Sequence, residues 1–315
     1  MVLEPIIPFE PIRSEKIPAG PDWIAQIKWD GVRMLTYFDG QSTRLWNRRR
    51  NERTLQYPEL LDVRAYCTAS SVILDGEVIA MDDAKPSFHQ IMKRESLRKE
   101  ANIVKARHQT PVTYMLFDLL MLNGEWVTDK PLAERQRLLE RVIRPQPSVQ
   151  LTPSMPDGQQ LFEVMKAHRM EGIVCKDLRS TYAVGGKDAR WIKRKIFHDL
   201  YAVIGGVTYR AGTVNAIMLG LYDREGRFVY IGHAGTGLVS REEWRQLTAL
   251  VEGMKIPQQP FVNEPERNSK EFAWLAPQLT AKIQYMEWTP HGTMRHPSIQ
   301  AFGGAEPAAC TFAQL

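Results

Sequence analysis

The sequence predicts an α+β domain followed by a small β-barrel, and two changes of pattern along the chain support this prediction. From Trp23 to about Ile196, short β-rich runs are broken by turn pairs, with two helical stretches between them. After His198 the pattern changes to glycine-containing strands with one helix, which suits a small barrel of the OB type. The length of 315 residues exceeds one average domain. We therefore expect two domains, residues 1–197 and 198–315.

The elements of the first domain follow from apolar runs and turn signals. The expected strands, bounded by Asp39-Gly40 and Asn123-Gly124 turns, lie at 25–38, 43–47, 72–81 and 113–121. Apolar residues at helical spacing among charged residues predict helices at 132–143 and 158–168. This mixture of strands and helices is an α+β pattern rather than a repeating β-α alternation.

The second domain is predicted from strands that contain or precede glycine. They read YAVIGGVT, AIMLGLYD, REGRFVYIGHAGTG, AKIQYMEWT and GTMRHPSI between residues 201 and 299. One helix is expected near 241–253. Short strands with a single helix fit an OB-fold, although periodicity alone does not separate it from other small barrels.

Composition and charge narrow the class of protein. A hydrophobic fraction of 43% and a charged fraction of 24% are ordinary for a folded globular chain. The net charge of +5 favours a polyanionic partner. No apolar run spans a bilayer and the start lacks the order of a signal peptide, so a cytoplasmic location without a membrane partner is expected. The three cysteines lie far apart in the sequence, so they predict neither a disulfide framework nor a pair of metal ligands. They are Cys67, Cys175 and Cys310.

Five short strings carry the chemically informative residues. They are IKWDGVR at 27–33, LDGEV at 74–78, FDLL at 117–120, EGIVCK at 171–176 and WIKRK at 191–195. Each string alone also has a purely structural interpretation: Glu77 at a hairpin, Phe117 in a core, or a solvated lysine at a strand end. Their joint occurrence in this order is what makes them specific.

In this order the strings resemble the motifs of the covalent nucleotidyltransferase superfamily, which includes DNA ligases, RNA ligases and mRNA capping enzymes. The resemblance implies an ATP-grasp-like adenylation domain followed by an OB-fold domain. Lys28 is implied to carry AMP, with Asp30 in the same catalytic motif. The residues implied to contact the nucleotide are Gln26, Arg33, Arg48, Glu77, Phe117, Glu171, Lys187, Lys193, Lys195 and Arg295.

The implied chemistry is consistent with these residue types. A lysine attacks a phosphorus atom only as the neutral amine, and neighbouring cations such as Lys193 and Lys195 favour that form. Glu77 and Glu171 are the implied ligands for Mg²⁺ or Mn²⁺. Gln26 stands where related DNA ligases often have a glutamate, but its carbonyl oxygen can still accept a hydrogen bond from the adenine amino group. Arg295, in MRHP, is assigned to the C-terminal pyrophosphate-orienting role.

Within the superfamily the sequence most resembles the ligase module of bacterial end-joining ligases, through FDLL and the EWTPHGTMRHPSI ending. Three scattered cysteines cannot build the zinc module of NAD-dependent ligases, so ATP is the expected cofactor. We expect a monomeric enzyme that seals nicked duplex DNA, in end joining or in a phage-type role, with its basic surface or a Ku-type partner holding the ends. The alternatives are an mRNA capping guanylyltransferase, an RNA ligase, and a non-catalytic OB-type nucleic-acid-binding protein.

Overall fold

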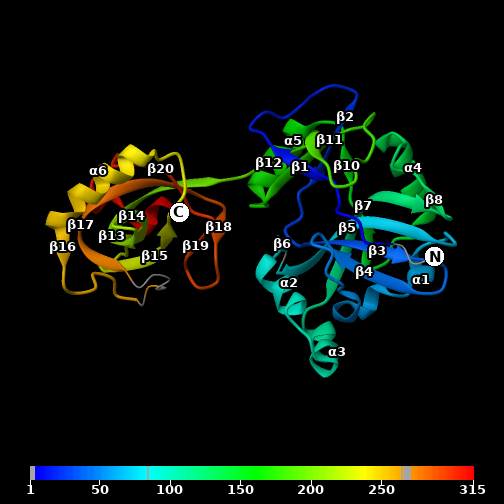
Figure 1. The fold of residues 1–315 in the computed structure, drawn as a ribbon, viewed down its shortest axis with the longest axis horizontal. Helices are drawn as coiled ribbons and strands as arrows, with labels where there is room; N and C mark the ends of the chain where they lie inside the picture. The colour runs from blue at the N-terminus through cyan, green and yellow to red at the C-terminus, as the bar shows by residue number, and fades with distance from the viewer. Residues whose placement is uncertain (1–3, 84, 264, 266–270) are drawn as a thin grey trace. The chain divides into compact units, whose positions relative to one another are not determined.

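The computed structural model describes residues 4–83, 85–263, 265 and 271–315. The chain divides into two compact units, Met1–Ile196 (unit 1) and Phe197–Leu315 (unit 2), shown in Figure 1. In the described residues, no helix is both long enough and apolar enough to cross a membrane.

The larger sheet of unit 1 has the order β4-β3-β5-β7-β8, with β6 paired to β5 and β9 paired to β7. Its long central strands are buried and give the unit its main core. The strands are β3 (Val32–Phe38), β4 (Thr43–Asn47), β5 (Val72–Asp82), β6 (Lys85–Pro86), β7 (Val112–Leu122), β8 (Glu125–Trp126) and β9 (Val149–Leu151).

The smaller sheet of unit 1 has the order β1-β12-β11-β2-β10. Helix α5 (Gly158–Ala167) packs its apolar stripe on β2 and β11, around Ala25 and Ile173. The Asp157 side chain caps α5 by accepting a hydrogen bond from the Gln160 amide. The strands are β1 (Glu10–Arg13), β2 (Trp23–Ile27), β10 (Ser154–Met155), β11 (Gly172–Asp177) and β12 (Lys187–Lys195).

The predicted continuous run from 25 to 38 is wrong, because the chain leaves one sheet and enters the other within it. Strand β2 ends at Ile27 in the smaller sheet, and β3 begins at Val32 in the larger one. A Cβ on Gly31 would lie 2.3 Å from the Val78 carbonyl oxygen, so only glycine allows this close approach to β5. The four residues between the strands, which include Lys28, therefore bridge the two sheets.

The prediction of only two helices in unit 1 is also wrong. The predicted helices correspond to α4 (Leu132–Val142) and α5, but the structure adds α1 (Val63–Tyr66), α2 (Phe88–Glu95) and α3 (Glu100–Gln109). In α3 only Ile103 is buried, so the sequence offers no apolar stripe from which the helix could be predicted. Short 3-10 turns lie at Thr54–Gln56 and Pro58–Leu60.

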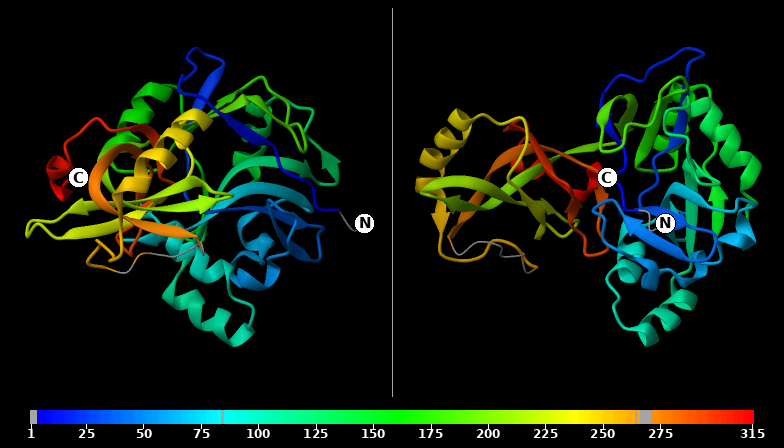
Figure 2. Two further views of the ribbon diagram at one scale, coloured as in Figure 1. Left: turned by 60° about the vertical axis from the view of Figure 1, so that its left-hand side comes forward. Right: turned by 45° about the vertical axis from the view of Figure 1, so that its right-hand side comes forward.

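Unit 2 is a curled antiparallel sheet of order β15-β14-β13-β17-β16, with β20 paired to β17, and it has the predicted OB-fold. Its helix α6 (Arg241–Val251) begins at a capping box formed by Ser240 and Glu243. Figure 2 shows the ribbon of unit 2 in two views. Its strands are β13 (His198–Arg210), β14 (Thr213–Tyr222), β15 (Phe228–Ala234), β16 (Lys255–Ile256), β17 (Phe272–Tyr285), β18 (Glu287–Trp288), β19 (Met294–Arg295) and β20 (Ser298–Phe302). Three 3-10 turns lie at Glu252–Met254, Pro307–Ala309 and Phe312–Gln314.

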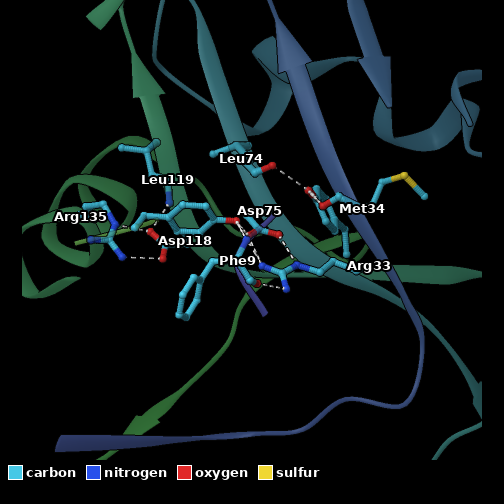
Figure 3. Close-up of polar contacts among 10 residues, drawn as sticks. Phe9, Arg33, Met34, Leu74, Asp75, Asp118, Leu119 and Arg135 are labelled. Atoms are coloured by element: carbon cyan, nitrogen blue, oxygen red, sulfur yellow. Dashed lines mark hydrogen bonds and ion pairs between the residues drawn. The ribbon is translucent and has the colours of Figure 1, made fainter. Parts of the chain in front are cut away.

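Figure 3 shows two arginine-carboxylate pairs in the interior of unit 1, Arg135 with Asp118 and Arg33 with Asp75. Arg135 on α4 forms two hydrogen bonds of 2.8 and 2.9 Å with Asp118 on β7, and both side chains are inaccessible to solvent. The remaining guanidinium donors reach the Lys130 and Ser180 carbonyl oxygens. The two buried charges of Arg135 and Asp118 therefore neutralise each other. Because Arg135 lies on α4 and Asp118 on β7, the pair fixes α4 on the larger sheet.

We expect Asp118→Ala to destabilise unit 1 by about 3–5 kcal/mol, because it leaves the Arg135 cation buried without a counter-charge. Chemical denaturation that follows unit 1 measures the change. Glu134→Ala is the matched control: Glu134 pairs with Lys130 at the surface, and its loss should cost less than about 1 kcal/mol. Equal losses in the two variants would contradict this account of the buried pair.

Candidate functional site

Lys28 lies at the centre of an ion-pair network on the smaller sheet. Its Nζ atom is 2.5 Å from Glu171 Oε2, and Lys195 Nζ is 3.0 Å from the other oxygen of the same carboxylate. The Glu171 side chain is only 7% exposed. Burial alone would raise the pKa of Glu171, but the charges of Lys28 and Lys195 lower it below its ordinary value. Glu171 is therefore an anion shared by two lysines.

Backbone contacts of Gly172, the residue after Glu171, fix the positions of Lys28 and Glu171 in this network. The Lys28 amide donates to the Gly172 carbonyl oxygen at 3.0 Å. Gly172 has a φ of +141°, and a Cβ there would lie 2.1 Å from the Arg194 carbonyl oxygen. Only glycine fits this position beside β12. The glycine of the EGIVCK string thus allows Glu171 to lie against Lys28 and Lys195.

One face of the smaller sheet carries the cations. Gln26, Val174 and Lys193 are cross-strand partners in a single row, and side chains of such a row point to one face. In WIKRK the alternation of the strand puts Trp191, Lys193 and Lys195 on this face. Arg194 points the other way, onto the Phe162 ring of α5. Burial lowers the pKa of Lys193, and the positive charges of Lys28 and Lys195 lower it further.

Phe117 of the larger sheet meets this face from across the unit. Its ring lies 6.0 Å from the Trp191 ring, edge to face, and between them is the ammonium group of Lys176. The Lys176 Nζ atom is buried without a hydrogen-bond partner in the structure. Burial lowers the pKa of Lys176 to about 7. An unpaired buried amine between two aromatic rings is a donor that a bound ligand can use.

Glu77 supplies a second, half-buried carboxylate near Lys28. It lies on β5 directly opposite Arg33 on β3. Burial raises the pKa of Glu77 to about 8, while the charges of Lys28 and Arg33 oppose this rise and the charge of Glu171 adds to it. Glu77 and Glu171 are therefore close enough to repel each other.

Arg33, predicted to contact ribose or phosphate, is held inside the unit. It forms two hydrogen bonds of 2.9 and 2.6 Å with the fully buried Asp75, and it also donates to the Phe9 carbonyl oxygen (Figure 3). Tyr182 donates to the same carboxylate at 2.7 Å. The Arg33 guanidinium lies 5.3 Å from the Phe117 ring centre. The arginine therefore supports the aromatic layer rather than standing exposed.

The other predicted residues differ in how near they lie to this network. Gln26 is buried on β2, with its amide donating to Ser154, and Asp30 lies in the segment that bridges the sheets. Arg48 is 55% exposed and pairs with Glu10. Lys187 is exposed at the start of β12, opposite Glu10 in register.

Arg295 belongs to unit 2, whereas all the other predicted site residues belong to unit 1. Its guanidinium donates to Glu287 at 2.6 Å, across the β18-β19 pair. The pair is partly buried, with 17% of the Arg295 side chain exposed. Its assignment to pyrophosphate stays a prediction.

Sequence reasoning missed four residues of the site or gave them too little weight. Asp75 and Trp191 stand inside the LDGEV and WIKRK strings, next to residues that were selected, and Lys176 closes EGIVCK. Tyr182 lies outside every string and offered no sequence signal. Their importance comes from contacts between segments far apart in the chain.

The donor set fits a divalent cation that is held partly by a nucleotide. No cluster of three or more His, Cys, Asp or Glu side chains suited to a metal exists among the described residues. Glu77 and Glu171 offer two neighbouring carboxylates. Mg²⁺ is commonly bound by one or two carboxylates together with substrate phosphates, so this pair matches that arrangement.

Comparison with known proteins identifies relatives over both units. Residues 12–195 match the family model "ATP dependent DNA ligase domain", and residues 210–302 match "ATP dependent DNA ligase C terminal region". The multifunctional non-homologous end joining DNA repair protein LigD of Mycobacterium tuberculosis is 32% identical over 285 residues, covering 88% of this chain and 35% of LigD. DNA ligase 2 of Methanosarcina acetivorans is 31% identical over 252 residues, covering 73% of this chain and 44% of that protein. The chain thus spans about a third of LigD.

Solved structures agree with the sequence matches. The ligase domain of M. tuberculosis LigD superposes with a TM-score of 0.54 at 27% identity, covering 99% of each chain. Mycobacterial DNA ligase D complexed with ATP gives a TM-score of 0.55 at 28% identity, again with 99% of each chain covered. From the family matches over both units, the chain belongs to the ATP-dependent DNA ligase family.

Proposed function

We propose that the chain seals nicks in duplex DNA, using ATP to form a lysyl-AMP on Lys28 and then a DNA-adenylate. The observation that carries this proposal is the shared Glu171 anion between Lys28 and Lys195, beside the cationic face of the smaller sheet. Family membership and the ATP complex of the related ligase D support ATP as the nucleotide. The mRNA capping and RNA ligase alternatives gain no support from the comparisons.

In the first step the neutral Lys28 amine attacks the α-phosphorus of ATP. An N–P bond forms and the P–O bond to pyrophosphate breaks. The nitrogen, now positively charged, loses one of its two protons and becomes a neutral phosphoramidate nitrogen. Glu171, the carboxylate that contacts Nζ, is the nearest acceptor for that proton. Lys193 and Lys195 lie on the same face and stabilise negative charge on the phosphates as pyrophosphate leaves.

In the second step an oxygen of the 5′ phosphate at the nick attacks the AMP phosphorus, and the P–N bond to Lys28 breaks. The 3′ hydroxyl then attacks the activated 5′ phosphate and AMP leaves, which closes the strand. In both steps the protein orients phosphates that approach in line. Lys28 is thus the only side chain that must form a covalent bond.

We propose that Glu77 and Glu171 hold a divalent cation, Mg²⁺ or Mn²⁺, when ATP is bound. Such a cation neutralises phosphate charge and orients the phosphoryl group. Phe117 is proposed to stack on the purine and Gln26 to accept from the adenine amino group, since both side chains border the cationic face. Arg33, Arg48, Lys187 and Arg295 stay as proposed phosphate or ribose contacts.

A sealing assay tests the proposal. A nicked DNA duplex with a 5′ phosphate should be joined with ATP and Mg²⁺, and GTP should not replace ATP. Joining of nicked RNA but not DNA would indicate an RNA ligase. Transfer of GMP from GTP would indicate a capping enzyme, and the absence of joining and of transfer would leave only a binding protein.

The proposed context is repair by end joining, because LigD is named for that process and covers most of this chain. We propose that the enzyme acts on cytoplasmic DNA as a monomer, with a Ku-type end-binding partner. Sealing of blunt or cohesive ends that rises when Ku is added supports this context. Efficient sealing of nicks with no effect of Ku on end joining would instead favour a phage-type replication or repair role.

We expect nick binding to weaken steeply as salt is added. Each phosphate contacted by Lys or Arg releases counterions, so the logarithm of the affinity falls with the logarithm of the salt concentration with a slope near −0.9 per contact. Fluorescence anisotropy of a labelled nicked duplex at several salt concentrations measures the slope. Affinity that does not change with salt would argue against a nucleic-acid substrate.

A further inference from the structure

The positive charge of the chain is concentrated in one segment. Residues 85–110 carry seven Lys or Arg side chains and two Asp or Glu side chains, a formal charge of +5 that equals the charge of the whole chain. Unit 2, by contrast, has ten basic and eleven acidic residues, a formal charge of −1. The attraction of the chain for a polyanion therefore arises in unit 1. We call residues 85–110, which include α2 and α3, the basic hairpin.

Two charges of the basic hairpin are internal and fasten it to the unit. Arg94 on α2 is fully buried, pairs with Glu59 at 2.8 Å and donates to the Gln56 and Thr110 carbonyl oxygens. Glu95 accepts from Arg53 at 2.5 Å and from Tyr57 at 3.0 Å. These buried pairs fasten α2 to residues 53–59, the segment of 3-10 turns that follows β4, so the remaining charges are presented on a packed support.

The other charges are exposed and unbalanced. One exposed acid, Glu100, accompanies six exposed cations. Within the described part of the chain, none of these six forms an ion pair with an acidic side chain. They are Lys85, Lys93, Arg98, Lys99, Lys105 and Arg107.

The cations of α3 do not contribute to the packing or the ion pairing of the helix. Ile103 is its only buried residue, whereas Val104 is 55% exposed. A solvated helix usually alternates charges of both signs and gains stability from pairs one turn apart. In α3 the cations have no such partners, so they leave a positive potential at the edge of unit 1. Figures 1 and 2 show α3 at the periphery of that unit in each view.

The basic hairpin follows the end of β5 that lies beside the Lys28 segment. Strand β5 passes the Lys28 segment, where Val78 pairs with Val32, and it continues only to Asp82 before the hairpin begins. The Asn47 side chain donates to Glu95 of α2 at 3.5 Å, so the exposed Arg49 and Arg50 that follow β4 lie at the same end. A polyanion reaching Lys28 can therefore continue onto the hairpin.

We propose that the basic hairpin binds the phosphate backbone of the duplex that flanks the nick, outside the residues that carry out the reaction. This inference rests on the proposed function. A ten-residue helix is about 15 Å long, and duplex DNA carries about one charge per 1.7 Å of axis, so α3 alone runs past several phosphates. The contact would add affinity without base specificity.

The test uses the full chain with Lys99→Gln, Lys105→Gln and Arg107→Gln combined. We expect self-adenylation by ATP to stay at the native rate, because none of these residues lies in the site. Binding of a nicked duplex with long arms should weaken at least about tenfold near 100 mM salt, and the salt slope should fall by up to about 2.7, or 0.9 for each lost contact. Anisotropy titrations measure both quantities.

The matched control removes three exposed cations of the same unit elsewhere: Arg137→Gln, Arg141→Gln and Arg144→Gln, in and just after α4. It should change the slope much less than the hairpin variant does. A charge-conserving variant, Lys99→Arg, Lys105→Arg and Arg107→Lys, should bind like the native chain, which separates charge from any damage to α3.

Equal salt slopes in the hairpin variant and the control would overturn the inference, and so would a charge-conserving variant that binds as weakly as the glutamine variant. Failure of the proposed function is seen separately. If the native chain neither joins nicked DNA nor accepts AMP, the function is wrong whatever the hairpin binds. If the native chain seals nicks and only the slopes fail to differ, the function stands and the hairpin inference alone is lost.

Discussion

Replacing Lys28 by alanine is expected to abolish transfer of AMP from ATP to the protein. Alanine has no nucleophile, and the neighbouring Lys195 is held on the other oxygen of Glu171, so it cannot take the place of Lys28 without a change of geometry. Sealing of nicks from ATP should disappear with the adduct. The loss should reach the detection limit, several orders of magnitude below the native rate.

The last step of the reaction should survive in the same variant. A nick whose 5′ phosphate already carries AMP needs only positioned ends and phosphate contacts, so Lys28→Ala should still seal it at a reduced rate. The Glu171 carboxylate keeps Lys195 as its partner, so the fold should tolerate the change. Lys166→Ala, an exposed lysine of α5, is the matched control and should behave like the native chain. A covalent AMP adduct on the Lys28→Ala protein would show that another residue is the nucleophile.

Glu171→Ala is expected to impair both the adenylation step and the sealing of a pre-adenylated nick. The change removes the anion between Lys28 and Lys195, both of which it orients, and one of the two proposed cation ligands. Loss of one preorganised group that stabilises a transition state can lower the rate about 10²- to 10³-fold, and we expect a loss of this size in each assay. Single-turnover rates of the two steps measure it.

A conservative variant and a matched control help to interpret the result for Glu171→Ala. Glu171→Gln keeps an oxygen acceptor of similar shape but no charge, so its rates should lie between those of alanine and the native chain. Glu163→Ala, an exposed carboxylate on the neighbouring α5, should leave both rates unchanged. If Glu171→Ala seals the pre-adenylated nick at the native rate, Glu171 serves only the first step and the proposed cation site must be reassigned.

Local patterns in the sequence predicted the elements that are determined locally. Strand β4 has the predicted bounds, 43–47, which follow from its residues and from the Asp39-Gly40 turn before it. Helices α4 and α5 were predicted from the helical spacing of their apolar residues. The run from 25 to 38 could not be divided correctly, because nothing in its composition shows that Ile27 and Val32 belong to different sheets. That division depends on the close approach of Gly31 to Val78, which is a contact across the fold.

Long-range contacts also explain what the motifs could not show about the site. The five strings contain Lys28, Glu171 and Lys195, but they do not show that these residues meet. Only the fold makes Glu171 the ion-pair partner of both lysines. Arg33 was expected to face the nucleotide, yet its guanidinium is paired with Asp75, 42 residues away in the chain. The burial of Lys176 between Phe117 and Trp191 likewise depends on two distant strands meeting.

The most direct test of the central claim is the intact mass of the protein after incubation with ATP and Mg²⁺, followed by peptide mapping of the adduct. We expect a gain of one AMP per chain, located on the peptide that contains Lys28, with release of pyrophosphate and reversal when pyrophosphate is added. No gain with ATP, a gain of GMP from GTP instead, or an AMP group on a peptide that lacks Lys28 would contradict it.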